Sequence, residues 1–227
     1  MPTFAQNREL VTPGTLLAKG DFVAGEHTYR RGDCVYSKYI GLVEYSDDRV
    51  SVIALSGRYI PKVDDAVIGL VTNSHFQSWD LEINSPYVAK LQSSDFWRRI
   101  DLTKDDLSEL LGVGAVVMGR ITRSDPLKGT TLTIRGRGLG EVRDGRLVVI
   151  SPAKVPRLIG RGGSMIKMLV KKTGCSIRVG QNGIIVVRGR SRKKEEQTIS
   201  AIKQVEMEAH TSGLTDRISA MLLGRLP

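Results

Sequence analysis

Hydrophobic and polar residues follow changing periods along the C-terminal third of this 227-residue chain. A short apolar run rich in β-branched residues leads to Pro152, and two stretches with apolar residues at helical spacing come next. Two further β-rich runs flank Asn182-Gly183, a pair that accepts positive φ and favours a hairpin. The pattern predicts a strand at 146–151, helices at 152–159 and 164–173, strands at 176–179 and 183–187, and a helix at 191–210.

The two predicted helices are joined by the loop Gly160-Arg161-Gly162-Gly163. Glycine has no Cβ and tolerates positive φ, so the backbone of such a loop is open to a ligand. The helix that follows presents free N–H groups and the positive end of its dipole, which favour a phosphate. Alone the Gly-x-x-Gly pattern is weak, because a chain with 24 glycines contains such turns by chance.

The order of elements around this loop makes the pattern specific. Strand, helix, glycine loop, helix, strand, strand and helix resemble the type I KH domain (βααββα), which clamps single-stranded nucleic acid with a GxxG loop. Ser164 is expected to cap the helix after the loop. The residues expected to bind RNA are Gly160, Arg161, Gly162, Gly163 and Lys167.

Residues 63–137 show the alternation of a small β-barrel with a helical insert. Thr103 is expected to be the N-cap of the insert, with acidic residues in its first turn. Strands are predicted at 66–72, 79–83, 87–91, 113–121 and 130–135. This is the plan of the OB fold, which binds oligonucleotides on a strand face. The runs Val67-Ile68-Gly69-Leu70-Val71 and Val113 to Ile121 resemble the S1 type of OB domain.

A base-stacking platform is expected on this barrel at His75, Phe76 and Trp79, with Arg120 and Arg123 as phosphate partners. S1 domains that bind RNA tightly usually have Phe-Gly-x-Phe/Tyr at this bend, whereas this chain has Phe76-Gln77-Ser78-Trp79. Trp79 therefore has two equal interpretations, base stacking or core packing. A lone histidine such as His75 is more often a surface or hydrogen-bonded residue than a ligand.

The N-terminal residues 1–60 carry seven basic and seven acidic residues and no recognisable chemistry. Strands are predicted at 35–45 and 50–55, around a polar turn. The pairs Asp47-Asp48 and Asp64-Asp65 invite a metal interpretation, but neighbouring carboxylates in strands and turns point to opposite sides and rarely chelate together. A neutral β-domain is more plausible as a protein-docking platform.

Positive charge is concentrated in one part of the chain. The whole chain has 34 basic and 24 acidic residues, and the window 113–192 holds 17 of the basic residues but only three acidic ones, a net charge of +14. Such a concentration indicates a polyanion as partner, although solvated faces that cluster only in sequence are the alternative. Arg135 and Arg137 are predicted to form a basic linker between the barrel and the KH domain.

Metal, cofactor and membrane binding are not expected. Cys34 and Cys175 are far apart without a metal-ligand spacing, so two free thiols are the default expectation and one disulfide stays open. No apolar run reaches membrane-spanning length, and the first ten residues lack the apolar core of a signal peptide. The one long amphipathic stretch, 191–210, mixes glutamates with its lysines, unlike a basic membrane helix. We therefore expect a soluble, intracellular protein.

The three parts together predict a multi-domain α+β protein: an N-terminal all-β domain (1–60), a central S1-type OB β-barrel (61–138) and a C-terminal KH domain (139–227). This order resembles the S1–KH cap subunits of the archaeal RNA exosome, of the ribosomal-RNA-processing-four type. The segments Val11-Thr12-Pro13-Gly14 and Ile159 to Ile166 are the most family-like.

The resemblance implies a cytoplasmic, non-catalytic subunit that captures single-stranded RNA. Three such subunits, alone or mixed with the other S1-containing cap subunit, sit on a hexameric ring of RNase PH-like subunits. The ring carries out phosphorolytic 3′-to-5′ cleavage, and the cap favours A-rich 3′ ends and feeds them inward. The N-terminal domain would dock on the ring.

The residues agree with a non-catalytic role, since we find no nucleophile beside a base, no metal cluster and no phosphate-loop lysine. Two alternatives stay open. One is a ribosome- or translation-associated factor that uses S1 and KH domains without a nuclease. The other is a fragment of polynucleotide phosphorylase, against which the order of the domains counts, because KH precedes S1 in that enzyme.

Overall fold

The fold was analysed in a computed structural model, which describes residues 2–55, 57–98, 100–101, 103–125, 127–209 and 213–222. The chain divides into two compact units, residues 1–57 and 58–227, and each is described by itself. None of the helices in these described ranges is long and apolar enough to span a bilayer.

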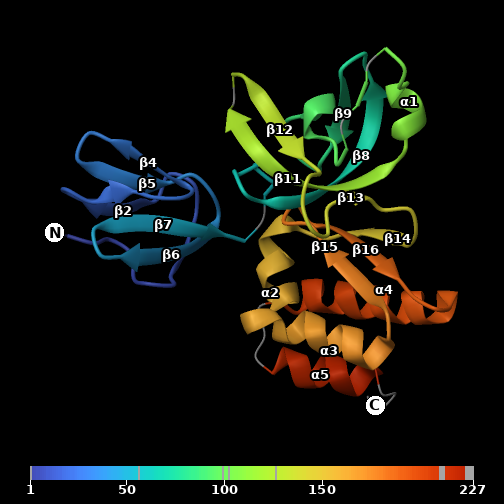
Figure 1. Cartoon of the computed structure of the whole chain (residues 1–227). Coiled ribbons are helices and arrows are strands. Elements are labelled where there is room, and N and C mark those ends of the chain that lie inside the picture. Colours follow the sequence, from blue (N-terminus) through green and yellow to red (C-terminus); the bar gives the residue numbers. More distant parts are fainter. Residues whose placement is uncertain are drawn as a thin grey trace. The chain divides into compact units, whose positions relative to one another are not determined.

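The N-terminal unit consists of two small β-sheets around an apolar core that includes Leu17, Val35, Val43 and Val50. One sheet has the order β1-β6-β7-β3 and the other β2-β5-β4 (Figure 1). The strands are β1 (Leu10–Val11), β2 (Leu16–Lys19), β3 (Val23–Ala24), β4 (Thr28–Arg31), β5 (Cys34–Ser37), β6 (Gly41–Ser46) and β7 (Arg49–Ala54). The predicted all-β character of this domain is confirmed.

The single strand predicted at 35–45 is wrong, because this segment forms two strands in different sheets. The chain turns after β5, where the Ser37 hydroxyl donates a hydrogen bond of 2.6 Å to the carbonyl of Tyr39. A side chain that bonds its own local backbone in this way competes with continued strand pairing. The β6–β7 hairpin forms at the predicted polar turn, with Asp47 at φ 47°.

The central barrel is built from five strands with the predicted order along the chain. They are β8 (Ala66–Ser74), β9 (Ser78–Glu82), β10 (Ala89–Gln92), β11 (Val116–Asp125) and β12 (Gly129–Thr133). The sheet runs β12-β10-β9-β8-β11, and the pairing of β12 with β11 closes it (Figure 1). A closed five-stranded barrel is the predicted OB-like architecture, and closure removes the unpaired strand edges.

The helical insert of the barrel is shorter than predicted. A short 3-10 turn η1 (Ser93–Asp95) follows β10, and the helix α1 spans only Leu107–Leu110. Its N-cap is Asp106, whose carboxylate accepts from the Ser108 N–H, and not Thr103. Thr103 instead donates its hydroxyl and its N–H to the Asp101 carboxylate, a local turn that precedes the helix.

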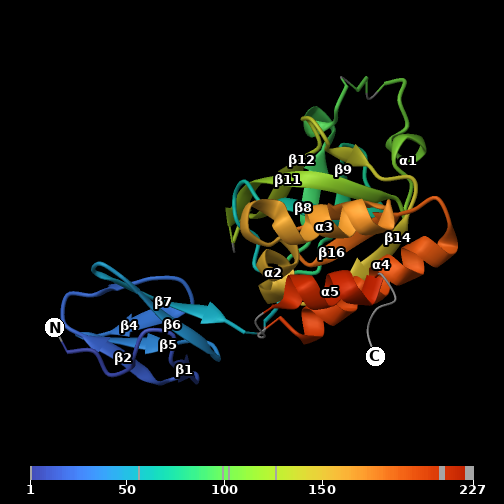
Figure 2. The ribbon, with the colours of Figure 1, turned by 90° about the horizontal axis from the view of Figure 1, so that it is seen from below.

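The C-terminal part of the second unit has the predicted KH order. It contains β14 (Arg146–Val149), η2 (Pro152–Lys154), α2 (Val155–Ile159), η3 (Arg161–Gly163), α3 (Ser164–Thr173), β15 (Ser176–Val179), β16 (Ile184–Arg188) and α4 (Arg192–Met207). The antiparallel sheet β14-β16-β15 carries the helices on one face (Figures 1 and 2). An additional helix that the sequence analysis did not identify, α5 (Leu214–Leu222), packs on α3 and α4.

The barrel and the KH domain meet at the β15–β16 turn, where the side chain of Asn182 is fully buried. Its Oδ1 accepts from Ile68 N–H at 3.3 Å, and its Nδ2 donates to the carbonyls of Ile68 (2.7 Å) and Ile83 (2.9 Å). The carbonyl of Asn182 accepts from Asn84 Nδ2, and Gln181 N–H donates to the Ala66 carbonyl. Five hydrogen bonds thus join a KH turn to β8 and to the segment after β9.

Close approach to the barrel depends on Gly180, whereas Gly183 packs closely against Ile150 within the KH domain. A Cβ on Gly180 would come within 2.9 Å of Ile68 N, and a Cβ on Gly183, where φ is +82°, within 2.2 Å of the Ile150 carbonyl oxygen. Backbone contacts of this kind leave no room for a side chain. The hairpin predicted at Asn182-Gly183 is confirmed. The sequence did not indicate that the same turn also connects the KH domain to the barrel.

We expect the substitution Asn182→Ala to lower the free energy of unfolding by about 2–4 kcal/mol, because it leaves buried backbone groups of Ile68 and Ile83 without partners. Urea unfolding followed by circular dichroism measures the change. Gln181→Ala is the matched control, since Gln181 is exposed and bonds the barrel through its backbone N–H only. Equal stabilities of the two variants would contradict this role of Asn182.

Candidate nucleic-acid interface

The glycine loop between α2 and α3 has the backbone geometry of an open phosphate site. Gly160, Gly162 and Gly163 all have positive φ, at 74°, 58° and 79°, a region that L-residues with side chains rarely adopt. A Cβ on Gly160 would lie 2.8 Å from Met165 N, so this glycine is needed for close packing. A Cβ on Gly162 would meet nothing within 4 Å, so the outer side of the loop is open.

The start of α3 carries no side-chain cap. The Ser164 N–H donates to the Arg161 carbonyl, and the Gly163 N–H donates to the Gly160 carbonyl at 3.1 Å. The N-cap is Gly163, which has no side chain, and no side-chain capping bond forms. The prediction that Ser164 caps this helix is therefore wrong, because Ser164 is already its first residue. Uncapped N–H groups together with the helix dipole favour an anion at this position.

Two cations flank the same loop. Lys167 Nζ donates to the Gly162 carbonyl at 3.0 Å, which holds its charge over the loop. The Arg161 side chain is exposed and forms neither a hydrogen bond nor an ion pair with any residue in the described part of the chain. The five residues predicted for this site thus occupy one continuous segment of surface around the start of α3.

On the barrel, cross-strand pairing places polar residues in a row across four strands. Asp80 of β9 pairs with Lys90 of β10, Lys90 with Thr131 of β12, and Thr131 with Arg123 of β11. Directly paired residues point to the same face. Their neighbours along the strands, among them Trp79, Leu91 and Leu132, fill the interior of the barrel. The row Asp80–Lys90–Thr131–Arg123, which we term the outer wall, therefore lies on the barrel surface.

His75 and Phe76 lie beside the outer wall, in the turn between β8 and β9. His75 Nε2 lies 2.8 Å from Asp80 Oδ2, so this histidine follows the hydrogen-bonded alternative. Phe76 is 73% exposed. An exposed aromatic ring next to a polar strand face is a surface on which a base can stack.

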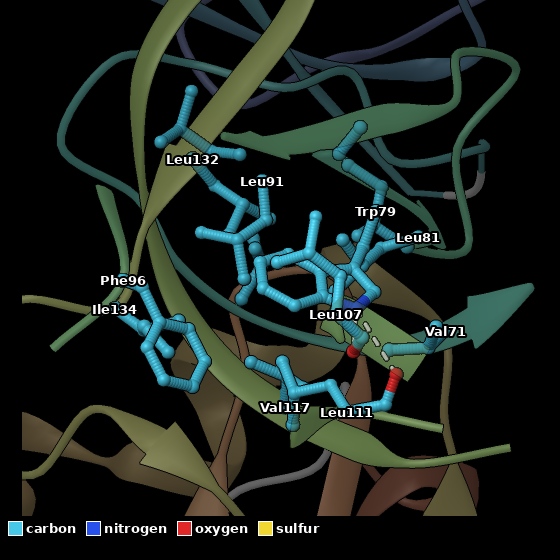
Figure 3. Close-up of a cluster of buried hydrophobic side chains, with 14 of the residues drawn as sticks. Val71, Trp79, Leu81, Leu91, Phe96, Leu107, Leu111, Val117, Leu132 and Ile134 are labelled. Carbon is cyan, nitrogen blue, oxygen red and sulfur yellow. Dashed lines mark hydrogen bonds between the residues drawn. The ribbon is translucent and has the colours of Figure 1, made fainter. Parts of the chain in front are cut away.

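Of the two interpretations of Trp79, core packing is correct and base stacking is not. Its side chain is 0% exposed, and it stacks on Phe96 with ring centroids 5.3 Å apart. Its Nε1 donates to the carbonyls of Leu107 (3.1 Å) and Leu111 (3.0 Å), as Figure 3 shows. A residue enclosed in this way cannot reach a base. Because side chains alternate along β9, the same strand that leaves Ser78 and Asp80 partly exposed directs Trp79 inward.

Two surface residues were missed by the sequence analysis. Trp97 is 66% exposed and rests at a tilt on Phe96, with ring centroids 5.8 Å apart. The segment from Ser93 to Trp97 is joined to the β8–β9 turn that carries Phe76, because Ser93 N–H donates to the Gln77 carbonyl. Lys90 lies in the outer wall. Composition could have pointed to Trp97, because the chain has only two tryptophans. The place of Lys90 on the barrel surface follows only from the pairing of β10 with β12.

The remaining predicted arginines have different surroundings. Arg120 donates to the Asp64 carbonyl at 3.0 Å, and Arg135 to the Phe96 carbonyl at 2.7 Å, so both help to fix local backbone. Arg137 is exposed. Arg123 lies near Asp125, whose pKa is lowered because its carboxylate accepts from the N–H groups of Lys128 and Leu127. Arg123 therefore has a stable negative charge nearby, which weakens its attraction for a phosphate.

The arrangement offers no metal centre within the part of the chain that the structure describes, where no three His, Cys, Asp or Glu side chains come together. Cys34 is partly exposed and Cys175 is buried, both as free thiols, and the Thr198 hydroxyl donates to the Cys175 sulfur. The chemistry available at the surface consists of cations, a helix N-terminus without a side-chain cap, and exposed rings. These groups bind polyanions and bases.

Comparison with known proteins gives a consistent assignment along the chain. Residues 8–56 match the family described as the N-terminal domain of the exosome RNA-binding protein RRP4, and residues 146–204 match the KH domain. The chain is 45% identical to the exosome complex component Rrp4 of Pyrococcus horikoshii, over 98% of this chain and 85% of that protein. It is 43% identical to the component of the same name from Methanothermus fervidus, over 97% of both.

A solved structure gives the same result at the level of the fold. A protein described provisionally as an exosome complex RNA-binding protein is 40% identical to this chain and superposes with a TM-score of 0.69. The match covers 74% of this chain and 97% of that one.

The two tryptophans of the barrel should respond differently to substitution. We expect Trp79→Phe to lower the free energy of unfolding by about 2 kcal/mol, because the carbonyls of Leu107 and Leu111 lose their buried donor. Trp97→Ala should change it by no more than about 0.5 kcal/mol, since this ring is mostly exposed. Urea unfolding of both variants measures the difference, and a larger loss from Trp97→Ala would contradict the assignment.

Proposed function

Because this chain belongs to the Rrp4 family of archaeal exosome components, we propose that it is a non-catalytic, cytoplasmic cap subunit that captures single-stranded RNA. It delivers the RNA to RNase PH-like subunits arranged as a hexameric ring, which perform the 3′-to-5′ phosphorolysis. Three copies, alone or together with the other S1-containing cap subunit, form the cap, and the neutral N-terminal domain docks on the ring.

The observation that carries the RNA-binding proposal is the open glycine loop at the start of α3. Positive φ at three glycines, an uncapped helix N-terminus and the two cations Arg161 and Lys167 all favour a phosphate at the same place. This part of the interface offers positive charge and N–H groups, which contact the sugar–phosphate backbone and carry no sequence information.

The barrel supplies the second part of the proposed RNA surface. The exposed rings of Phe76 and Trp97 can stack on bases of any identity, and Lys90 adds a charge on the outer wall. Every base can stack on an aromatic ring, but purines stack more strongly than pyrimidines. We therefore attribute the proposed preference for A-rich 3′ ends to stacking strength and not to hydrogen bonds with base edges. Trp79 has no part in this surface, because it is buried in the core.

We expect Arg161→Glu to weaken the binding of single-stranded RNA to a similar extent for all sequences and to reduce the slope of log K against log salt by about 0.7, the value for one phosphate contact. Fluorescence anisotropy with labelled A-, U- and C-rich oligonucleotides between low and moderate salt measures both quantities. Arg161→Lys, which keeps the charge, is the control. Unchanged affinity and slope would show that this loop does not hold RNA.

The assembly proposal is tested by affinity purification of the full chain from native archaeal lysate. RNase PH-like subunits in amounts near equal to the chain are the expected partners. The competing function, a ribosome- or translation-associated factor with S1 and KH domains, predicts ribosomal proteins instead. Recovery of ribosomal proteins without RNase PH-like subunits would overturn the cap assignment and leave the RNA-binding surfaces as they are.

A further inference from the structure

We propose that the KH domain carries a second RNA-backbone site, an arginine-lined groove between its sheet and the linker from the barrel. This inference rests on the proposed RNA-binding function and adds a site to it. The groove encloses about 650 Å³, within the roughly 300–1,000 Å³ typical of ligand sites. Its walls include four arginines, Arg143, Arg178, Arg188 and Arg190, and two acidic residues, Glu141 and Asp144.

Strand register places this groove on the face of the sheet that the helices leave uncovered. Ile177 pairs with Val187, and both pack in the core with the helices. Arg178 pairs with Val186 and Ser176 pairs with Arg188, so these residues alternate to the opposite face. Figure 1 shows this sheet between the barrel and α3 and α5, with the linker segment around β13 (Gly140–Glu141) beside it. Arg178 and Arg188 therefore point into the space between the sheet and the linker.

The charges in the groove are only partly neutralised. Arg143 pairs with Glu141 at 2.9 Å and Arg188 with Asp144 at 3.3 Å, and three of these four side chains are more than 60% exposed. Exposed pairs of this kind are weak and exchange readily for a phosphate. The side chains of Arg178 and Arg190 are exposed and form no ion pair or hydrogen bond with other described residues. Two unpaired guanidinium groups in a concave site match the bidentate geometry of phosphate oxygens.

The groove is separate from the glycine loop. Gly174, directly after the C-terminal end of α3, lines the groove, whereas the glycine loop precedes the N-terminal end of the same helix. Ten residues at a rise of 1.5 Å each put about 15 Å of helix between the two sites. One RNA strand bound at the loop would present its next phosphates to the groove at a high effective concentration. The second contact therefore adds affinity even where each contact alone is weak.

The test compares two double variants of the full chain that change the net charge by the same amount. Arg178→Glu/Arg190→Glu alters the groove, and Lys19→Glu/Lys38→Glu alters exposed lysines of the N-terminal unit. Arg178→Gln/Arg190→Gln removes the cations without adding negative charge. The probe is a labelled single-stranded RNA of about 20 nucleotides, a length that can occupy more than one site, followed by fluorescence anisotropy over a salt series, with thermal melts to verify folding.

We expect the groove variants to lose about tenfold in affinity, as for two exposed charge contacts, and about 1.4 in salt slope, as for two phosphates. The lysine control should keep most of the affinity. Unchanged binding in the groove variants, with Arg161→Glu still weakened, would overturn this inference and leave the proposed function intact. Absence of RNA binding in the unaltered protein would overturn the proposed function itself. If poly-glutamate binds the groove and RNA does not, the groove takes an acidic protein segment and the inference is wrong.

Discussion

The buried amide of Asn182 is the interaction on which the arrangement of the second unit depends. A side-chain amide has the same donor and acceptor groups as a peptide bond, and Asn182 uses them as a strand residue would, pairing with both the N–H and the carbonyl of Ile68. Its third bond, to the Ile83 carbonyl, and the bond from Asn84 to its own carbonyl fix the end of β9 as well. Any shift of the KH domain against the barrel would leave several buried polar groups unsatisfied, at about 1–3 kcal/mol each.

This joint places the elements of the proposed RNA surface in one compact unit. The outer wall of the barrel, the glycine loop and the arginine groove belong to elements that meet at β8 and the β15–β16 turn. A rigid array loses little conformational entropy when a flexible strand binds to it, because only the strand is ordered. Fixed spacing also means that the contacts act together only on an RNA long enough to reach all of them. Long RNA strands would therefore bind more tightly than short fragments.

Sequence reasoning was most successful where a pattern has a local physical cause. The positive φ values of the glycine loop, the Asn-Gly turn and the period of the helices all follow from a few neighbouring residues, and the KH order followed from them. It failed where the cause lies elsewhere in the chain. The burial of Trp79 depends on carbonyls of Leu107 and Leu111, about thirty residues away. Asn182 joins the two domains only because it bonds the backbone of Ile68. Lys90 lies in the outer wall only because strand pairing aligns it with Asp80 and Thr131.

The distribution of charge explains how such a surface can hold RNA without keeping it in one register. The excess of positive charge lies in residues 113–192, and the structure divides it among the barrel, the glycine loop and the sheet groove. Each proposed contact is exposed and individually weak, so a bound RNA strand would release one while the others hold. Deep pockets that read base edges would instead fix a single register and slow the advance of the strand. In the proposed function the subunit delivers RNA to an enzyme and needs retention together with movement, which separated backbone contacts would provide.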